Sequence, residues 1–334
     1  MNLPRDCGYM VTDRDHVYLA IENNCIKVNA RSGKTETEFN CPKIDDDHDY
    51  NWGYVATIDG LLFGSSVRSG NFYTEGRGPW YDDSGFNNAQ DSHKVLSDCL
   101  FAVDLAGNSQ AWKYNGVIIN STIAIGGDQI YFVENRTPKV LQDKSRRLSG
   151  GKEWMALHLV ALDVKTGKPV WEKGMQFEQR TPVFFSTYKD GTLIVLRSSP
   201  KSFDLRAIDA KSGKSLWNRD YGWENNHHGA HRRHPVIIGD VVYQQPLAYD
   251  LKTGKEKWST SKVGVGGNCG TLSASSTMLF SRLSDYPGFI DLGKGMNKEN
   301  LVEITRPGCW INIIPVGGMV LVPEAGSGCS CEYS

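Results

Sequence analysis

The sequence predicts an all-β fold, a β-propeller built from four-stranded antiparallel blades. Two observations predict it. A hairpin motif returns at intervals of just over 40 residues, and many short apolar runs are separated by turns in a chain that holds 35 glycines in 334 residues. Four strands within a repeat of about 40–45 residues are typical of one propeller blade. Forty per cent of the residues are hydrophobic, which is enough for a substantial core.

The hairpin motif is clearest in residues 159–171, 205–217 and 247–258. Each copy reads Ala-apolar-Asp, then Thr or Ser, Gly and Lys, and finally Trp. The Asp side chain can accept a hydrogen bond from a backbone N–H two residues later, and the Gly supplies the positive φ of a tight turn. The Trp lies on the outgoing strand, where its apolar area suits packing between repeats. A weaker copy occupies 101–112 and a degenerate one 26–34.

A further pair of strands precedes each hairpin, as in 235–238 with 241–243. Seven inner strands are predicted to begin near Tyr9, Tyr54, Thr122, Val183, Pro235, Thr271 and Ile311. We therefore expect a single β-propeller domain over 1–334, with blades near 9–39, 54–113, 121–174, 182–220, 235–260, 271–305 and an incomplete one at 311–334. The incomplete blade leaves two explanations open: a fragment of a longer, eight-bladed ring, or a ring closed by a short blade.

Composition and charge exclude several classes of function. The formal net charge is −1, whereas a nucleic-acid-binding protein usually carries a basic excess, so we expect no nucleic-acid partner. No run approaches the ~18 apolar residues of a membrane span, and the N-terminus has no apolar signal core. Eight cysteines could form disulfides in an exported protein, in any of 105 pairings.

The hairpins resemble the repeat of the quinoprotein, or PQQ-like, propeller superfamily, Ala-apolar-Asp-x-x-Thr-Gly-Lys-x-x-Trp. The C-terminal runs 306–315 and 328–331 are similar to those of uncharacterised bacterial PQQ-like propeller proteins. The superfamily includes PQQ-dependent alcohol dehydrogenases and non-enzymatic scaffolds such as the outer-membrane assembly lipoprotein propeller. The resemblance implies a periplasmic or extracellular location. In the dehydrogenases the quinone lies between a Trp and a disulfide of adjacent cysteines beside calcium. No adjacent cysteine pair occurs here, so the resemblance implies the fold without the catalytic residues.

Aligning the predicted inner strands predicts a funnel at one mouth of the propeller. The residues just before these strands include cysteines, tryptophans and a basic run, and we expect them to converge there. The ligand-binding candidates are Trp52, His228, His231, Arg232, Arg233, His234 and Trp310; the candidates for a metal site or disulfides are Cys7, Cys269, Cys309, Cys329 and Cys331. Arginine grips carboxylates, tryptophan stacks on planar ligands, and thiolate and imidazole suit copper or zinc. A disulfide between Cys269 and Cys309, or simple packing, remains the alternative.

Two blades carry insertions, at Ser65–Ser97 and Asn135–Glu153, which are either lids or solvated loops. Two functions stay open at this point. The first is a binding or scaffolding module whose axial funnel takes a protein partner or a small molecule. The second is an oxidoreductase of the quinoprotein type, which would use PQQ with calcium or a copper ion. The sequence shows no nucleophile elbow, Walker loop or His-Glu-x-x-His motif.

Overall fold

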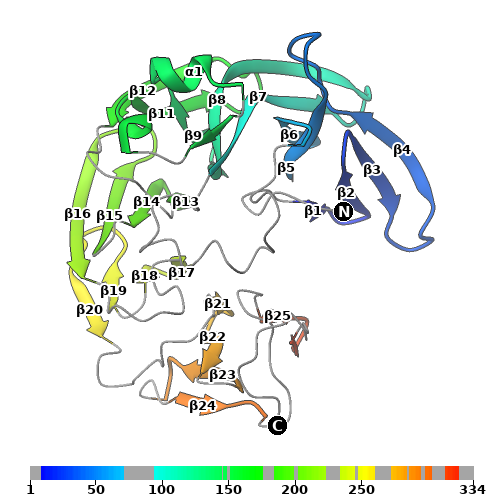
Figure 1. The fold of residues 1–334 in the computed structure, drawn as a ribbon. Coiled ribbons are helices and arrows are strands. Elements are labelled where there is room, and N and C mark those ends of the chain that lie inside the picture. The colour runs from blue at the N-terminus through cyan, green and yellow to red at the C-terminus, as the bar shows by residue number, and fades with distance from the viewer. Residues whose placement is uncertain are drawn as a thin grey trace. The chain divides into compact units, whose positions relative to one another are not determined.

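The computed structural model describes most of the chain, and its elements are almost wholly antiparallel strands (Figure 1). The described residues are 9–70, 94–144, 146–148, 151–175, 184–198, 202–222, 234–244, 247–259, 272–283, 286–294, 298–302 and 313–322. Within these ranges the helical elements are α1 (Pro138–Gln142) and the 3-10 turn η2 (Gly151–Trp154). None of the helices described is long and apolar enough to cross a membrane.

The N-terminal half of the chain holds two sheets. The first blade pairs its strands in chain order: β1 (Met10–Thr12), β2 (His16–Ile21), β3 (Asn24–Asn29) and β4 (Thr35–Asn40). The second and third blades share one continuous sheet, made of β5 (Tyr50–Ile58), β6 (Leu61–Arg68), β7 (Lys94–Asp104), β8 (Ser109–Gly126), β9 (Gln129–Asn135), β11 (Leu157–Asp163) and β12 (Pro169–Met175). The sheet is continuous because β8, 18 residues long, ends one blade and begins the next.

The later strands repeat the same plan. The fourth blade is β13 (Phe184–Lys189), β14 (Thr192–Ser198), β15 (Ser202–Asp209) and β16 (Ser215–Gly222); the fifth is β17 (Val236–Ile238), β18 (Val241–Gln244), β19 (Leu247–Asp250) and β20 (Glu256–Ser259); the sixth is β21 (Ser273–Ala274), β22 (Met278–Leu283), β23 (Tyr286–Asp291) and β24 (Lys298–Asn300). The pair β25 (Ile314–Val316) and β26 (Met319–Leu321) follows. The predicted architecture of four-stranded antiparallel blades is confirmed.

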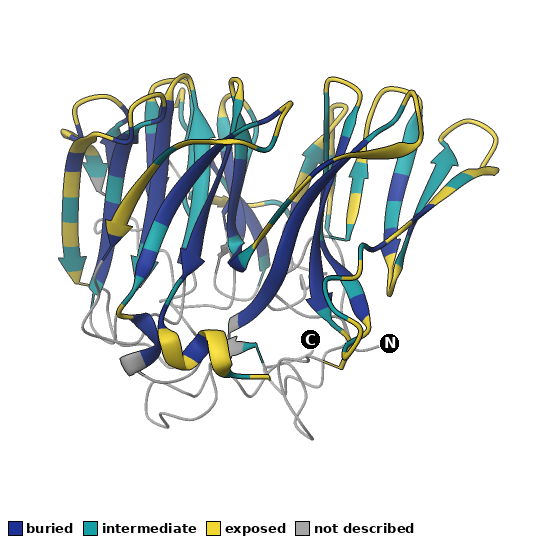
Figure 2. Ribbon diagram, turned by 90° about the horizontal axis from the view of Figure 1, so that it is seen from above, coloured by how far each residue is buried: buried dark blue, intermediate teal, exposed yellow. Residues whose placement is uncertain are grey.

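The chain separates into two compact units, residues 1–191 with 211–213, and residues 192–210 with 214–334. In the first, one apolar cluster fills the space between the first and second blades and another the space between the second and third. In the second, a cluster joins the fifth and sixth blades. Figure 2 shows buried segments in the middle strands and exposed ones along the outermost strands and turns. The prediction of a single domain stays a prediction.

The repeated turn has the predicted chemistry. The Asp163 carboxylate accepts hydrogen bonds from the backbone N–H groups of Lys165, at 3.2 Å, and Thr166, at 2.8 Å. Gly167 then adopts φ +66°, a conformation that costs glycine nothing. The indole of Trp112 covers this glycine and donates its N–H to the carbonyl of Val164 over 2.9 Å. The tryptophan of one blade therefore packs against the turn of the next blade and donates a hydrogen bond to it.

The second inner strand differs from the prediction. It begins at Tyr50, four residues before the expected Tyr54. A bulge between Trp52 and Tyr54 lets pairing with β6 continue past this point. Gly53 makes that close approach tolerable, because a Cβ there would lie 2.2 Å from a methyl group of Val67. Trp52 therefore lies inside the strand and not at its entrance.

Candidate functional site

The insertion between β9 and β11, residues 136–156, is the most elaborated part of the described chain. It begins with α1, whose first residue is Pro138, a favourable residue at that position because it lacks the N–H that would go unpaired. Val140, Leu148 and Trp154 are its buried apolar side chains. The carbonyl of Glu153 accepts a hydrogen bond from the Asn135 amide over 2.7 Å, which closes the segment.

The insertion belongs to the third blade but reaches back to the second. Its strand β10 (Arg147–Leu148) pairs antiparallel with the start of β7, so that Arg147 lies opposite Val95. Arg146, just before β10, accepts a backbone hydrogen bond from Leu96 over 3.1 Å. The insertion thus adds a strand to β7 and bridges two blades.

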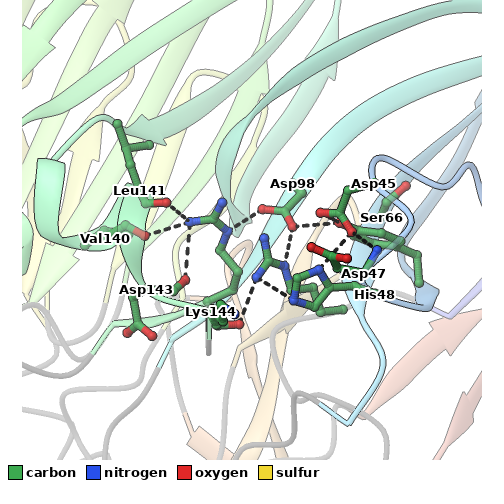
Figure 3. A network of polar contacts seen from close by, with 12 residues as sticks. Asp45, Asp47, His48, Ser66, Asp98, Val140, Leu141, Asp143 and Lys144 are labelled. Carbon is green, nitrogen blue, oxygen red and sulfur yellow. Dashed lines mark hydrogen bonds and ion pairs between the residues drawn. The ribbon is translucent and has the colours of Figure 1, made fainter.

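Asp98 on β7 is the centre of a network of charged side chains at this bridge (Figure 3). One carboxylate oxygen accepts a hydrogen bond from Arg68 Nε over 2.6 Å, and the other is paired with Arg146 Nε. The side chains are 5 % exposed for Asp98, 10 % for Arg68 and 12 % for Arg146, so water screens these pairs little. Burial is the largest single effect and lowers the pKa of Arg68, but the hydrogen bond to Asp98 and the charges of the surrounding acidic groups together outweigh it, so the pKa of Arg68 is raised.

Arg146 serves two elements at once. Its Nη1 group donates to the carbonyls of Val140, at 2.7 Å, and Leu141, at 3.1 Å, at the C-terminal end of α1, where the Val140 carbonyl also accepts the backbone N–H of Asp143. Its backbone has φ +50°, a conformation that costs a non-glycine residue about 1–2 kcal/mol. The ion pair with Asp98 and the capped carbonyls offset that cost. Arg146 therefore connects α1 and β10 to the second blade.

The loop before β5 joins the same network. Arg68 Nη1 donates to the carbonyl of Lys144 over 2.9 Å and to His48 Nε2 over 3.2 Å. The other imidazole nitrogen of His48 lies 2.8 Å from Asp45. The hydrogen bond with His48 holds the pKa of the Asp45 carboxyl below its usual range. The hydroxyl of Tyr50, the first residue of β5, donates a hydrogen bond to Asp45 over 3.0 Å and so links this loop to the strand.

A second charged cluster lies where the insertion begins. Arg136 Nε donates to Glu134 over 2.9 Å, and its Nη2 group lies 2.8 Å from the carboxylate of Glu172 on β12. Tyr114 donates its hydroxyl proton to Glu134 over 3.0 Å. The imidazole Nδ1 of His158 lies 3.4 Å from Arg136 Nη1. The hydrogen bond from Arg136 lowers the pKa of Glu172. The start of the insertion, at Arg136, and its middle, at Arg146, are thus both attached through arginine.

The outward side of the insertion is apolar in part. The side chains of Leu141 and Met155 are 48 % and 60 % exposed, although the segment that carries them is anchored by buried residues. Lys139 is 72 % exposed and pairs with Glu153 over 3.0 Å. Because the segment is already anchored, its exposed apolar side chains can contact another molecule with only a small loss of conformational entropy.

The structure places few of the residues predicted to form the funnel. Trp52 is 1 % exposed, donates its indole N–H to the carbonyl of Phe39 over 3.2 Å, and packs edge-on against Phe101. It has no face free for a ligand, because the strand begins earlier than its pattern predicts. His234 is half-buried. The remaining candidates lie outside the described residues: Cys7, His228, His231, Arg232, Arg233, Cys269, Cys309, Trp310, Cys329 and Cys331.

Sequence reasoning did not select the residues of the Asp98 network. One signal was available, because Arg68 lies in the first insertion, Asp98 directly follows it and Arg146 lies in the second. Nothing in the local sequence pairs them, since Arg146 and Asp98 are 48 positions apart. The two long insertions indicate which part of the chain holds the network. Which residues pair there depends on the pairing of β10 with β7.

The cysteines that the structure describes do not fit the quinone site of the dehydrogenases. Cys25, Cys41 and Cys99 are free thiols buried in one apolar cluster, so they supply no disulfide of neighbouring residues. Burial raises the pKa of each of them to about 12, which keeps them protonated. Across the described ranges, no group of three or more histidine, cysteine or acidic side chains is arranged to hold a metal ion.

Comparison with known sequences finds relatives for the middle of the chain. A family model described as outer membrane protein assembly factor BamB matches residues 155–264. The outer membrane protein assembly factor BamB of Burkholderia pseudomallei (strain K96243) is 30 % identical over 142 residues, 40 % of this chain and 34 % of that protein. The match thus spans about a third of the length of that relative. The range matched by the family model includes the three clearest hairpins.

Comparison with solved structures shows the fold. A europium-containing methanol dehydrogenase superposes with a TM-score of 0.50 at 9 % identity, covering 90 % of this chain and 69 % of that one. A quinohemoprotein alcohol dehydrogenase from Comamonas testosteroni gives 0.51 at 11 % identity, with coverages of 87 % and 58 %. A chain of the mitotic checkpoint complex gives 0.54 at 10 % identity, with coverages of 92 % and 82 %. At such identities the likeness concerns the fold alone.

Proposed function

We propose that this chain, a member of the PQQ-like propeller superfamily, is a binding or scaffolding module that holds a partner protein on the surface of its 136–156 insertion. The observation that carries the proposal is the anchoring of that insertion. The buried ion pair between Arg146 and Asp98, which Arg68 supports, fixes this insertion of the third blade to the second blade, and the insertion still presents Leu141 and Met155 to solvent. The family description that matches residues 155–264, an assembly factor, supports a role in holding other proteins.

The axial funnel belongs to the same proposal as a second binding surface. His234 would mark its rim, with His228, His231, Arg232, Arg233 and Trp310 around it as contacts for a protein segment or a small molecule. The cysteines Cys7, Cys269, Cys309, Cys329 and Cys331 would supply disulfides or metal ligands there. The resemblance to an outer membrane assembly factor favours a periplasmic or extracellular location.

Site-directed photo-crosslinking tests the proposal. A benzophenone amino acid replaces Leu141 or Met155 in the full chain, produced in its own organism, and a third variant carries it at Leu216. Leu216 is 44 % exposed on an outer strand and serves as the matched control. Irradiation should give one discrete protein adduct at Leu141 and Met155, identified by mass spectrometry, and none at Leu216. The absence of a discrete adduct, or the same adducts at all three positions, would overturn the proposal.

The oxidoreductase alternative is tested separately. Purified protein is titrated with PQQ and calcium, and with a copper salt, while the absorbance spectrum is recorded. A module without redox chemistry leaves the spectrum equal to the sum of its components. Saturable, stoichiometric binding that is lost when Cys269 and Cys309 are both replaced by Ser would instead favour a quinone- or metal-dependent enzyme.

A further inference from the structure

The 136–156 insertion is rich in basic residues. It holds six lysine and arginine residues and two acidic ones, whereas the whole chain has a formal net charge of −1. Two of the arginines, Arg136 and Arg146, are already paired with carboxylates outside the insertion. Among the side chains that the structure describes, the charge left for another molecule therefore belongs to Lys139 and Lys144.

The lysines of the insertion are more exposed than its acidic residues. Lys139 and Glu153 form an ion pair over 3.0 Å, but the lysine side chain is 72 % exposed and the glutamate side chain only 9 %. Lys144 is exposed as well, while Asp143 just before it is half-buried. A molecule that approaches the insertion therefore meets lysine ammonium groups before it meets a carboxylate.

The exposed apolar side chains of the insertion lie beside these lysines. Pro138 and Leu141 are three positions apart in α1, so they are neighbours on its surface, and both are exposed. The hydroxyl of Thr137, the residue before α1, is hydrogen-bonded over 3.2 Å to backbone groups on both sides of Met155. Met155 is therefore held next to the start of α1.

We propose that the partner held on the insertion, whose existence rests on the proposed function, docks through an acidic segment in which Asp or Glu residues are interspersed with apolar ones. The apolar side chains of that segment cover Pro138, Leu141 and Met155, and its carboxylates pair with Lys139 and Lys144. Protein interfaces commonly surround an apolar centre with a polar rim, and complementary charge fixes the orientation of the two partners.

A neighbouring acidic loop limits where such a segment can lie. Residues 45–49 contain four aspartates, three of which are exposed. The loop adjoins the insertion through Arg68, which is hydrogen-bonded to His48 over 3.2 Å and to the Lys144 carbonyl over 2.9 Å. Because like charges repel each other, an acidic segment avoids this loop and lies along α1 instead.

An anionic lipid surface is the other ligand that basic and apolar side chains attract, and the geometry favours it less. Helices that bind in a membrane interface carry a large apolar face. The helix α1 has five residues, and its exposed apolar residues are Pro138 and Leu141. A patch of this size suits a single polypeptide segment better than a lipid surface.

Charge removal combined with photo-crosslinking at Met155 tests the inference. In the double variant Lys139→Gln and Lys144→Gln, the yield of the protein adduct should fall about fivefold, as expected for the loss of two exposed ion pairs. The matched control, Lys34→Gln with Lys211→Gln, removes two exposed lysines from turns of other blades and should give the natural yield. Thermal melts followed by circular dichroism show that both variants fold.

The adduct itself gives a readout that needs no lysine variant. Mass spectrometry of the cross-linked peptide should identify a partner segment with a negative net charge, and irradiation of a cell extract in about 0.5 M salt should lower the yield, because salt screens exposed ion pairs.

The outcomes separate this inference from the proposed function. A neutral or basic partner segment, or equal yields in the lysine variant and its control, would overturn the inference while partner binding itself stands. A phospholipid adduct in place of a protein adduct, or no adduct at all, would refute the proposed function and this inference with it.

Discussion

The indole N–H of Trp217 donates to the backbone carbonyl of Leu251 over 2.9 Å, although the two residues are 34 positions apart. Trp112 makes the same bond to Val164, 52 positions away. In each case the ring covers the glycine of the next blade's turn, Gly254 under Trp217 and Gly167 under Trp112. The Trp and Gly of the repeated sequence motif thus form the same contact between successive blades.

Replacing Trp217 separates the two parts of this contact. Trp217→Phe keeps much of the ring but removes the donor, which should cost about 1 kcal/mol of unfolding free energy. Trp217→Ala also opens a cavity and should cost about 3–5 kcal/mol. Leu216→Ala, at an exposed neighbouring position, should stay within about 0.5 kcal/mol. Urea denaturation followed by circular dichroism measures the unfolding free energy of all three variants. Equal losses of unfolding free energy in the three would contradict a stabilising role for the Trp217 contact.

The glycine beneath the tryptophan should be harder to replace than its equivalent elsewhere. Gly167 and Gly33 occupy the same turn position with φ +66° and +69°, but an added Cβ would lie 2.5 Å from the Trp112 ring at Gly167 and meets nothing within 4 Å at Gly33. Gly33→Ala should therefore cost only the strain of positive φ, about 1–2 kcal/mol. Gly167→Ala should cost more, because Trp112 must move. Matched thermal melts compare them, and identical shifts would mean that Trp112 yields freely.

Asp98→Asn should destabilise the bridge between the second and third blades. Removing one charge from a buried pair costs about 3–5 kcal/mol, because Arg68 and Arg146 would both lose the carboxylate with which they pair. Asp49→Asn is the control, since Asp49 pairs with Lys43 at 80 % exposure and such pairs contribute about 0–1 kcal/mol. Urea denaturation gives the energies, and limited proteolysis between residues 136 and 156 shows where structure is lost. A loss at Asp98 as small as that at Asp49 would refute the network's structural role.

Acid stability should depend on the aspartates of the repeated turns. Hydrogen bonds from the backbone N–H and then the hydroxyl of Thr253 lower the pKa of Asp250 to about 2. Because its folded pKa lies below the unfolded value of about 3.9, Asp250 contributes stability above that value, which is lost as pH falls through about 2. Asp250→Asn should keep the turn, as Asn29 does in the first blade, and flatten the pH dependence between those limits. Acid titration of natural and variant protein, followed by circular dichroism, would show superimposable curves if the aspartate played no part.

The three buried thiols should be inert in the folded protein. Burial raises the pKa of Cys25, Cys41 and Cys99 to about 12, so little thiolate exists at about pH 8. Iodoacetamide should label these residues only in denaturant, as peptide mass spectrometry would show residue by residue. Rapid labelling of any of them without denaturant would contradict the burial.

The blades could be predicted from the sequence because their determinants are local. Asp163, Gly167 and the alternation of apolar residues around them specify strand, turn and strand within a dozen positions. The repetition of that unit, and of the Trp that follows it, then indicates stacked four-stranded sheets. Even the start of the second inner strand was predicted only to within four residues, because the bulge after Trp52 depends on its contact with Val67.

What the sequence by itself determined is therefore the kind of unit and its repetition. Only the tertiary structure decided that Trp52 is buried against Phe101 and that Arg146 finds Asp98 across two blades. The physical reason is that these contacts join positions with no pattern between them. Their partners are selected by strand register and by the path of an insertion, and both are consequences of how whole sheets pack.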